Sequence, residues 1–214
     1  MRIGLYGGSF DPVHYGHLNV ARSALSALSL DRLVVLPAAV SPFKTNRPIA
    51  SGAVYGWAER LEMIRAVFGQ LEKTVVDDRE LKRGGVSYAI DTVREIAAEN
   101  PDAEIFFIIG EDSVAGLERW KDYDALRRLC SFKSFPRTEE SSTSVRELFA
   151  RRGVRVNGDG KIAAAVREGL VRKGGFCPCR LAKSPEFFCP CEEFRAQLAD
   201  EDFHGFCHCR LYEV

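Results

Sequence analysis

Two histidines near the start of the chain have the spacing of a phosphate-binding site. His14 and His17 follow the glycine-rich turn Gly7-Gly8-Ser9 and are three residues apart. Two imidazoles at this spacing fall on one side of a helical turn, where both can donate hydrogen bonds to a phosphoryl group that gains charge during displacement. The glycines let the backbone approach phosphate, and the helix start beyond them offers unpaired N–H groups. The alternatives are a packing or capping role for both histidines, or a metal site, which would lack a third ligand at a suitable spacing.

A second anion-binding pattern lies much later in the chain. Ser141 is followed by Ser142 and Thr143, and Arg146 completes the run. Hydroxyl groups at the start of a helix, next to a guanidinium group, form an anion cradle. These residue types predict a second anion-binding helix start, far along the chain from the first pattern.

Six of the seven cysteines form three Cys-x-Cys pairs near the end of the sequence. The pairs are Cys177 with Cys179, Cys189 with Cys191, and Cys207 with Cys209. In a reducing compartment such clustering favours metal binding or redox chemistry over structural disulfides. Zinc is one alternative, although its ligand pairs usually have two to four residues between them. Six cysteines also exceed the four that a tetrahedral metal or a [4Fe–4S] cluster needs.

These residues require a scaffold, and the hydrophobic pattern predicts an α/β one. Predicted strands cover Arg2–Tyr6, Arg32–Pro37, Lys73–Asp77 and Glu104–Ile109. Predicted helices cover His17–Ser29, Trp57–Phe68, Tyr88–Glu99 and Lys161–Lys173. Strands that alternate with helices of this length form right-handed βαβ units. We therefore expect a doubly wound parallel sheet of the Rossmann-like type, with the glycine turn at the carboxyl end of its first strand.

Composition limits the class of protein and suggests a boundary. The 214 residues carry no net charge and are 46% hydrophobic, which gives no basis for attraction to nucleic acid or to an anionic membrane. No apolar run is long enough to cross a bilayer, and the first residues lack a signal-peptide pattern, so we expect a cytoplasmic protein. The glycine-rich stretch Gly153–Gly160 predicts a linker. We expect one domain over residues 1–152 and a small, mainly helical cysteine domain over residues 153–214.

The segment Gly8-Ser9-Phe10-Asp11-Pro12-Val13-His14-Tyr15-Gly16-His17 resembles the signature of the HxGH nucleotidyltransferases, and Ser141–Arg146 resembles their second signature. Within that superfamily the chain is most similar to bacterial nicotinate mononucleotide adenylyltransferases. Further matches are Pro42-Phe43-Lys44, Arg60-Leu61-Glu62-Met63, Ser87–Thr92, Ile109–Ser113 and Trp120. The family usually has histidine where Phe43 stands.

The resemblance implies a reaction and assigns residues to it. The 5′-phosphate of a pyridine mononucleotide would attack the α-phosphate of ATP, and pyrophosphate would leave with Mg²⁺. The implied catalytic residues are His14, His17, Lys44 and Arg146. The implied ATP-binding residues are Gly7, Gly8, Ser9, Phe10, His14, His17, Gly110, Asp112, Ser142, Thr143 and Arg146. The implied substrate-binding residues are Ser87, Tyr88, Thr92 and Trp120, of which Trp120 would stack on the pyridine ring or else serve as an ordinary packed aromatic residue.

One departure from the family concerns the segment before the second signature. Relatives usually have several tens of residues there, whereas only residues 121–140 separate Trp120 from Ser141. We therefore expect a strand and part of the substrate wall to be missing, with altered or lost turnover.

The end of the chain, roughly residues 155–214, resembles the catalytic subunit of ferredoxin:thioredoxin reductase. The resemblance implies a [4Fe–4S] cluster held by Cys177, Cys189, Cys191 and Cys207. It also implies a redox-active disulfide between Cys179 and Cys209, with His208 assisting proton transfer and with ferredoxin and a thioredoxin-like protein as partners. Such a disulfide exchanges with a partner through a mixed disulfide.

These resemblances leave three hypotheses open. The first is an adenylyltransferase fused to an active disulfide reductase. The second is a ferredoxin-dependent reductase whose N-terminal domain only binds nucleotide, and the third is a pseudoenzyme with a zinc-stabilised tail. Phosphopantetheine adenylyltransferases and cytidylyltransferases share the first signature, but the former typically have threonine where His14 stands.

Overall fold

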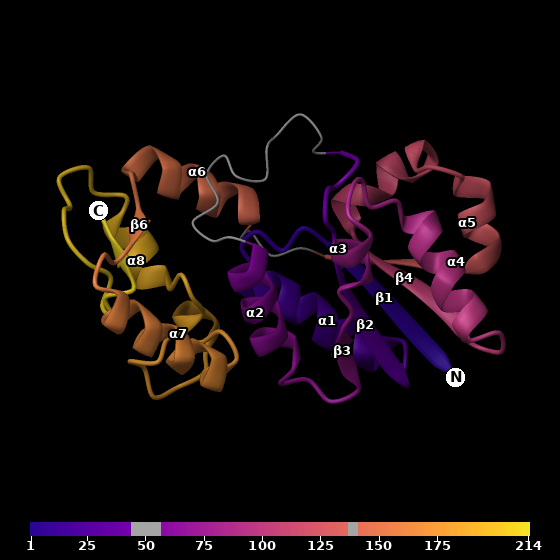
Figure 1. Ribbon diagram of the computed structural model, residues 1–214, viewed down its shortest axis with the longest axis horizontal. Coiled ribbons are helices and arrows are strands. Elements are labelled where there is room, and N and C mark those ends of the chain that lie inside the picture. The colour runs from indigo at the N-terminus through magenta and orange to yellow at the C-terminus, as the bar shows by residue number, and fades with distance from the viewer. Residues whose placement is uncertain (44–56, 137–140) are drawn as a thin grey trace. The chain divides into compact units, whose positions relative to one another are not determined.

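The computed structural model describes residues 1–43, 57–136 and 141–214 (Figure 1). The chain forms two compact units. Within the described residues, the first unit contains residues 1–9, 16–43 and 71–136, and the second contains residues 10–15, 57–70 and 141–214. Among the described residues, no helix combines the length and the apolar character that a bilayer-spanning segment requires. The boundary expected between residues 152 and 153 stays a prediction.

The first unit is built on a five-stranded parallel sheet in the order β3-β2-β1-β4-β5. Its strands are β1 (Arg2–Gly8), β2 (Arg32–Pro37), β3 (Thr74–Val76), β4 (Glu104–Gly110) and β5 (Ser131–Phe135). The chain winds outward on one side of β1 and then reverses, so that β4 pairs with its other edge. Such a reversal is the switch point at which open α/β sheets bind ligands. The predicted Rossmann-like parallel sheet is confirmed.

Hydrophobic residues on β1, β2 and β4 explain why these strands are central. Ile3, Leu5, Leu33, Leu36 and Ile108 have no exposed surface. A strand buried on both faces needs an unbroken apolar run, and β4 has one in which every residue after Glu104 is buried. The sheet's connections are α1 (Tyr15–Ala27), α3 (Arg79–Arg83), α4 (Ala89–Glu99), the 3₁₀ helix η1 (Glu111–Arg119) and α5 (Tyr123–Leu129).

The short segment before the second signature still holds a strand, whereas the expected loss of a family strand and of part of the substrate wall stays a prediction. The short segment after Trp120 holds both α5 and β5, and β5 pairs with β4 in parallel from Phe106–Ser131 to Gly110–Phe135. A strand of five residues and a helix of seven fit because the connections are very short. The sheet is therefore extended on its β4 side despite the small number of residues.

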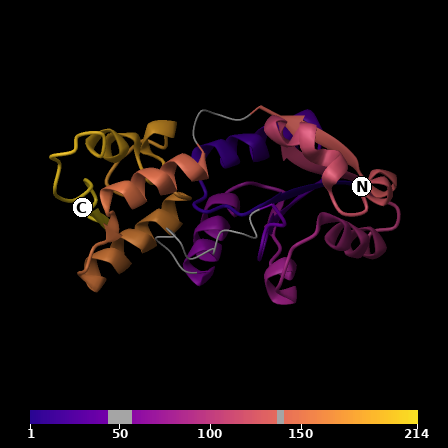
Figure 2. The ribbon, with the colours of Figure 1, turned by 90° about the horizontal axis from the view of Figure 1, so that it is seen from above.

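The second unit gathers helices and short strands around the cysteines. It contains α2 (Trp57–Phe68), α6 (Ser142–Arg152), β6 (Arg155–Val156), α7 (Gly160–Lys173), the 3₁₀ helix η2 (Pro185–Phe187), α8 (Glu192–Gln197) and β7 (Tyr212–Glu213). α2 packs on α7, and β6 pairs antiparallel with β7, beside α6 and α8 (Figure 2). The predicted helix ending in Gly174-Gly175 is confirmed, since Gly174 caps α7 at φ +66°. After residue 153 the regular structure is mostly helical, in α7, η2 and α8, but more than half of this region has neither helix nor strand.

Candidate functional site

The loop between β1 and α1 carries the first phosphate motif and has a constrained backbone. Phe10 adopts a φ of +44°, which is rare for a bulky residue, and it is only 2% exposed. Its ring packs edge-to-face on Phe68 of α2, with centroids 5.5 Å apart. The Asp11–Pro12 peptide bond is cis. Unusual backbone held in place by packing is a common feature of functional loops.

The start of α6 carries the second motif and meets this loop. The Ser142 hydroxyl donates a hydrogen bond to the Pro12 carbonyl oxygen at 2.9 Å, across 130 residues of sequence. The Arg146 guanidinium donates to the Asp11 carbonyl oxygen and, through Nη2, to Thr143 Oγ1 at 3.1 Å. Two motifs far apart in sequence are therefore joined inside the second unit.

A capping box fixes the first turn of α6. The Ser141 hydroxyl oxygen accepts a hydrogen bond from the Ser144 backbone N–H at 3.0 Å, while the Ser141 backbone N–H donates to Ser144 Oγ. Such reciprocal caps satisfy two backbone or side-chain donors at once and hold the helix start rigid. The positive end of the α6 dipole and the Arg146 guanidinium are groups that attract anions, and the capping box fixes the helix start that carries them.

Arg60 adds a second cation that the sequence analysis did not select as a site residue. It is 3% exposed on α2, and its Nη1 lies 3.8 Å from Asp11 Oδ1. Arg146 Nη1 lies 4.0 Å from the other oxygen of the same carboxylate. Burial lowers the pKa of Arg60, while the Asp11 carboxylate opposes that shift. A signal existed, because Arg60 stands four residues before the buried Ile64 and thus on the apolar face of its helix.

The histidines and glycines of the first motif occupy defined positions in their own units. His14 is buried, at 8% exposed, and His17 lies on α1 with its ring centroid 6.4 Å from that of Tyr6. Gly7 and Gly8 end β1, and a Cβ at Gly7 would lie 3.4 Å from the Phe107 ring. Gly110 ends the adjacent strand β4, so glycines flank the switch point on both of its strands.

Some of the predicted substrate-binding residues form contacts within the protein itself. The Ala39 N–H donates to Ser87 Oγ at 2.9 Å, and the fully buried Thr92 donates its hydroxyl to Glu80 Oε1 at 2.8 Å. Burial raises the pKa of Glu80. The Lys121 ammonium lies 4.4 Å from the centre of the Tyr88 ring. Substrate contacts at Ser87, Tyr88 and Thr92 stay predictions, as does the role of the exposed Asp112. Lys44 lies outside the described residues.

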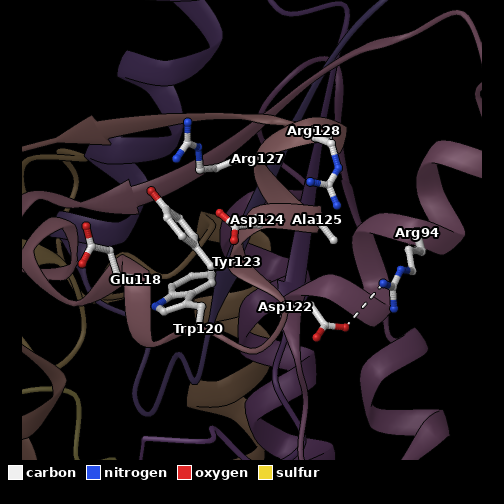
Figure 3. Close-up of a pocket in the computed structure, with 9 residues that line it drawn as sticks. All are labelled: Arg94, Glu118, Trp120, Asp122, Tyr123, Asp124, Ala125, Arg127 and Arg128. Atoms are coloured by element: carbon white, nitrogen blue, oxygen red, sulfur yellow. Dashed lines mark hydrogen bonds and ion pairs between the residues drawn. The ribbon is translucent and has the colours of Figure 1, made fainter.

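Trp120 belongs to an aromatic cluster of the first unit. Its ring packs edge-to-face on Phe107 and Phe132, with centroids 5.4 and 5.8 Å away, and it is tilted against the exposed Phe43 at 6.1 Å. Trp120 also lines an open cavity of about 680 Å³ (Figure 3). Besides Trp120, the lining residues are Arg94, Glu118, Asp122, Tyr123, Asp124, Ala125, Arg127 and Arg128. The half-buried indole thus has a packing role that leaves part of its surface available for stacking.

The six clustered cysteines come together in the second unit. The sulfur atoms of Cys177, Cys179 and Cys209 lie within 4.8 Å of one another, and Cys207 Sγ is 3.7 Å from Cys209 Sγ. Cys189 shares the same apolar cluster, together with Cys191. All seven cysteines fall in the described part of the chain and carry free thiols. The predicted division into four cluster ligands and one redox pair, and the role of the exposed His208, stay predictions.

Burial and mutual hydrogen bonding set the charge of these thiols. A hydrogen bond from Cys209 lowers the pKa of Cys177 to about 6 against the effect of burial, and Cys209 does the same for Cys207. The pKa of Cys209 is raised correspondingly, and burial raises that of Cys189. Thiolates are the metal-binding form of cysteine. Two thiolates near neutral pH make the group a soft ligand set for a cation.

Comparison with known proteins identifies the family. The model of the cytidylyltransferase-like family matches residues 5–168, more than half of the chain. The chain belongs to the cytidylyltransferase-like family. A probable nicotinate-nucleotide adenylyltransferase from Gemmatimonas aurantiaca is 37% identical over 194 residues, which cover 85% of this chain and 88% of that protein. Another, from Geobacter, is 43% identical over 148 residues, and the match spans 69% of this chain but only 66% of that relative's length.

Solved structures agree with this family at the level of the fold. A putative nicotinate-nucleotide adenylyltransferase from Vibrio parahaemolyticus has a TM-score of 0.55 at 18% identity, covering 70% of this chain and 87% of that one. A Plasmodium falciparum nicotinic acid mononucleotide adenylyltransferase complexed with APC has a TM-score of 0.52 at 16% identity, covering 69% and 83%. The expected membership of a nucleotidyltransferase family is confirmed.

Proposed function

We propose that this chain transfers the adenylyl group of ATP to nicotinate mononucleotide, or to its nicotinamide counterpart, and releases pyrophosphate. The observation that carries the proposal is the junction of the two phosphate motifs, made by Ser142 on Pro12 and by Arg146 on Asp11. Similarity to the relatives from Geobacter and Gemmatimonas aurantiaca supports the choice of substrate. The expected product class is a pyridine dinucleotide, which places the reaction in NAD biosynthesis.

The proposed mechanism needs no protein nucleophile. The phosphate of the mononucleotide attacks the α-phosphorus of the Mg²⁺ complex of ATP in line with the departing pyrophosphate. His14 and His17 donate hydrogen bonds to the phosphoryl oxygens, whose charge grows in the transition state. Arg146 and Lys44 neutralise the phosphates, and the first turn of α6 presents Ser142 and Thr143 to them. Catalysis then consists of positioning plus electrostatic stabilisation.

Arg60 supports this mechanism indirectly. It lies beside Asp11 at the base of the loop that carries His14. With Arg146 on the other oxygen, the Asp11 carboxylate is held between two cations, and the loop cannot turn without breaking both contacts. We therefore assign Arg60 as a positioning residue for the loop between β1 and α1 (residues 9–14), which we call the phosphate loop.

The proposal is tested by pyrophosphate release from ATP. The full chain, incubated with Mg²⁺, ATP and either mononucleotide, is expected to release pyrophosphate only when a mononucleotide is present. The ratio of kcat/KM for nicotinate and nicotinamide mononucleotide defines the substrate. Release without an acceptor, or none with either acceptor, contradicts the assignment.

A second activity is favoured by the gathering of six cysteines in one unit. We propose that the cysteine centre holds a [4Fe–4S] cluster and reduces a disulfide of a thioredoxin-like partner. Three observations support a metal centre: the sulfur of the proposed ligand Cys177 lies within 4.8 Å of those of Cys179 and Cys209, all six thiols except that of Cys179 are buried, and hydrogen bonds from Cys209 lower the pKa of Cys177 and of Cys207. Cys177, Cys189, Cys191 and Cys207 would hold the cluster, which supplies electrons from ferredoxin one at a time.

The remaining cysteine pair fits the role of the exchanging thiols. Cys179 is exposed, whereas its proposed partner Cys209 is buried, and their sulfur atoms lie within 4.8 Å. An accessible thiol can attack a partner disulfide, and a buried neighbour can then resolve the mixed disulfide. His208, exposed next to Cys209, would move protons during that exchange.

Metal analysis after anaerobic purification distinguishes the alternatives. An iron–sulfur chain is expected to be brown, with broad absorbance near roughly 400 nm and matching iron and sulfide contents. A colourless chain with stoichiometric zinc contradicts the reductase and supports the zinc-stabilised tail.

A further inference from the structure

Tyr15 occupies an unusual place between the two proposed centres of the second unit. It follows His14 directly, as the first residue of α1. Its ring packs edge-to-face on Phe176 and Phe188, with centroids 6.4 and 6.2 Å away. These two phenylalanines also pack on each other at 5.2 Å. The result is an aromatic triad of Tyr15, Phe176 and Phe188.

Each phenylalanine of the triad immediately precedes a cysteine of the centre. Phe176 and Phe188 face each other in an antiparallel bridge. The Cys177 N–H donates to the Phe187 carbonyl at 2.7 Å, and the Cys189 N–H donates to the Gly175 carbonyl at 2.9 Å. The two cysteine segments are thus joined at the point where their phenylalanines hold Tyr15. Each cysteine is therefore connected, covalently and by backbone hydrogen bonding, to the segments that carry the triad.

A second route links the start of α6 to the same cysteines. Phe149, one turn after Arg146 on α6, packs edge-to-face on Tyr212 with centroids 5.1 Å apart. The Tyr212 N–H donates to Cys207 Sγ at 3.3 Å, and the Cys189 thiol donates to the Tyr212 hydroxyl oxygen at 3.8 Å. The helix that presents the second phosphate motif is therefore packed on the cysteine centre.

We propose that Tyr15 is a positioning residue through which the occupied cysteine centre holds the phosphate loop in its ATP-binding conformation. In the proposed centre, Cys177 and Cys189 are both ligands, so the bound metal group would join their two segments, fix the triad and thereby order the backbone next to His14. Without this group the cysteine segments lose those bonds, the triad loosens, and ATP binding must bear the cost of ordering the loop. This inference rests on the proposed ATP site and metal centre.

The coupling between metal binding and ATP binding must act in both directions. If loading the centre strengthens ATP binding by some factor, ATP must strengthen metal retention by the same factor. A typical coupling corresponds to a factor of roughly 5 to 150. Tyr15→Leu keeps apolar bulk but removes the aromatic ring, so the ratio of the ATP Kd values without and with metal should fall towards one. Tyr15→Phe keeps the ring and should keep the ratio of the original chain.

The experiment uses the anaerobically purified full chain and measures by calorimetry the Kd with which the protein binds Mg²⁺–ATP. The measurement is repeated after a chelator has removed the metal of the cysteine centre under reducing conditions. For the original chain and Tyr15→Phe, we expect the Kd to rise by about fivefold or more on metal removal. For Tyr15→Leu, and for the second variant Phe188→Leu, the two Kd values should agree within about twofold. The control Tyr123→Leu removes a tyrosine that packs on Phe132 in the other unit and should behave like the original chain.

Two further readouts separate coupling from damage. Saturating ATP should raise the chelator concentration that removes half of the metal, by the same factor as the change in Kd. Circular dichroism verifies that each form is folded. Equal Kd values for the loaded and metal-free original chain overturn the coupling and leave the proposed function intact. Full coupling in both Tyr15→Leu and Phe188→Leu overturns the role of the triad. Absence of ATP binding in every form overturns the proposed function and the coupling with it.

Discussion

The phosphate loop and the cysteine centre share one compact unit, but they are stabilised in different ways. In the phosphate site, protein groups satisfy one another: Ser142 bonds Pro12, Arg146 bonds Asp11, and Ser141 caps the helix. In the cysteine centre, sulfur atoms contact other sulfur atoms, as Cys207 does with Cys209 at 3.7 Å. The first site is therefore preorganised without its ligand. The second gathers free thiols that hydrogen-bond one another, and a metal completes it only in our proposal.

This difference predicts different responses to mutation. Loss of one group from a preorganised phosphate site should lower the rate of reaction and leave the fold intact. Loss of one ligand from the cysteine centre should lower metal affinity and stability together, because metal binding contributes to folding. The four predictions that follow are ordered from the largest expected effect to the smallest.

Replacing His14 should give the largest change. In His14→Ala, kcat should fall by about 100- to 1000-fold, since one donor to the charged transition state is lost. The KM for ATP and the melting temperature should change little. Steady-state pyrophosphate release measures the effect, and His204→Ala, at an exposed histidine of the same unit, serves as the control. A loss of kcat below about threefold removes His14 from the mechanism.

Replacing a cysteine of the centre tests the other half of the comparison. Cys207→Ser should lower metal affinity by roughly 100-fold and also lower the melting temperature. The matched control is Cys130→Ser. Cys130 is buried, lies outside the six-cysteine group, and donates its thiol to the Leu126 carbonyl. Chelator titration and thermal unfolding provide the two readouts. Unchanged metal content in Cys207→Ser would show that Cys207 is not a ligand.

Replacing Arg146 by lysine keeps its positive charge but removes the guanidinium group, and so tests whether charge alone is enough at the phosphate site. Arg146→Lys should reduce kcat/KM for ATP by about 10- to 100-fold, because lysine cannot reproduce the guanidinium fork that bonds Asp11 and Thr143. The control Arg155→Lys alters an exposed arginine paired with Glu213 and should be neutral. Equal kcat/KM values in the two variants would mean that Arg146 contributes charge alone.

The smallest expected effect separates the two roles of Trp120. Trp120→Phe keeps an aromatic ring against Phe107 and Phe132, so stability should fall only slightly. If the indole also stacks on the pyridine ring, the KM for the mononucleotide should rise by roughly 3- to 10-fold while the KM for ATP stays constant. Tyr123→Phe, which alters a neighbouring residue of the same cavity, is the control. An unchanged KM assigns Trp120 to packing.

Much of the fold followed from hydrophobic pattern. The predicted strand Glu104–Ile109 became β4 with one more residue, and the predicted helix Lys161–Lys173 became α7 with one more at its start. β5 was missed because its residues alternate in polarity and only partly bury, as expected at a sheet edge. The short segment before Ser141 holds β5, so the length of a segment alone does not exclude a strand from it.

Site residues that belong to short sequence motifs could be predicted. Site residues that act through contacts with distant parts of the chain could not. The first phosphate motif was predicted from Gly7–His17, and the second was recognised in Ser141–Arg146 through the resemblance to the HxGH nucleotidyltransferases. Arg60 was missed as a site residue because its partner Asp11 is 49 residues away in sequence. The packing of Tyr15 against the cysteine segments could not be predicted either, since it joins residues more than 150 positions apart.

The most direct test of the central claim is detection of the product itself. The full chain, ATP, Mg²⁺ and nicotinate or nicotinamide mononucleotide are incubated together, and products are separated and weighed by mass spectrometry. The account predicts a dinucleotide with the combined mass of the mononucleotide and an adenylyl group, formed in equal amount to pyrophosphate and lost in His14→Ala. Intact ATP with both mononucleotides, under conditions where the chain is folded and metal-loaded, would contradict it.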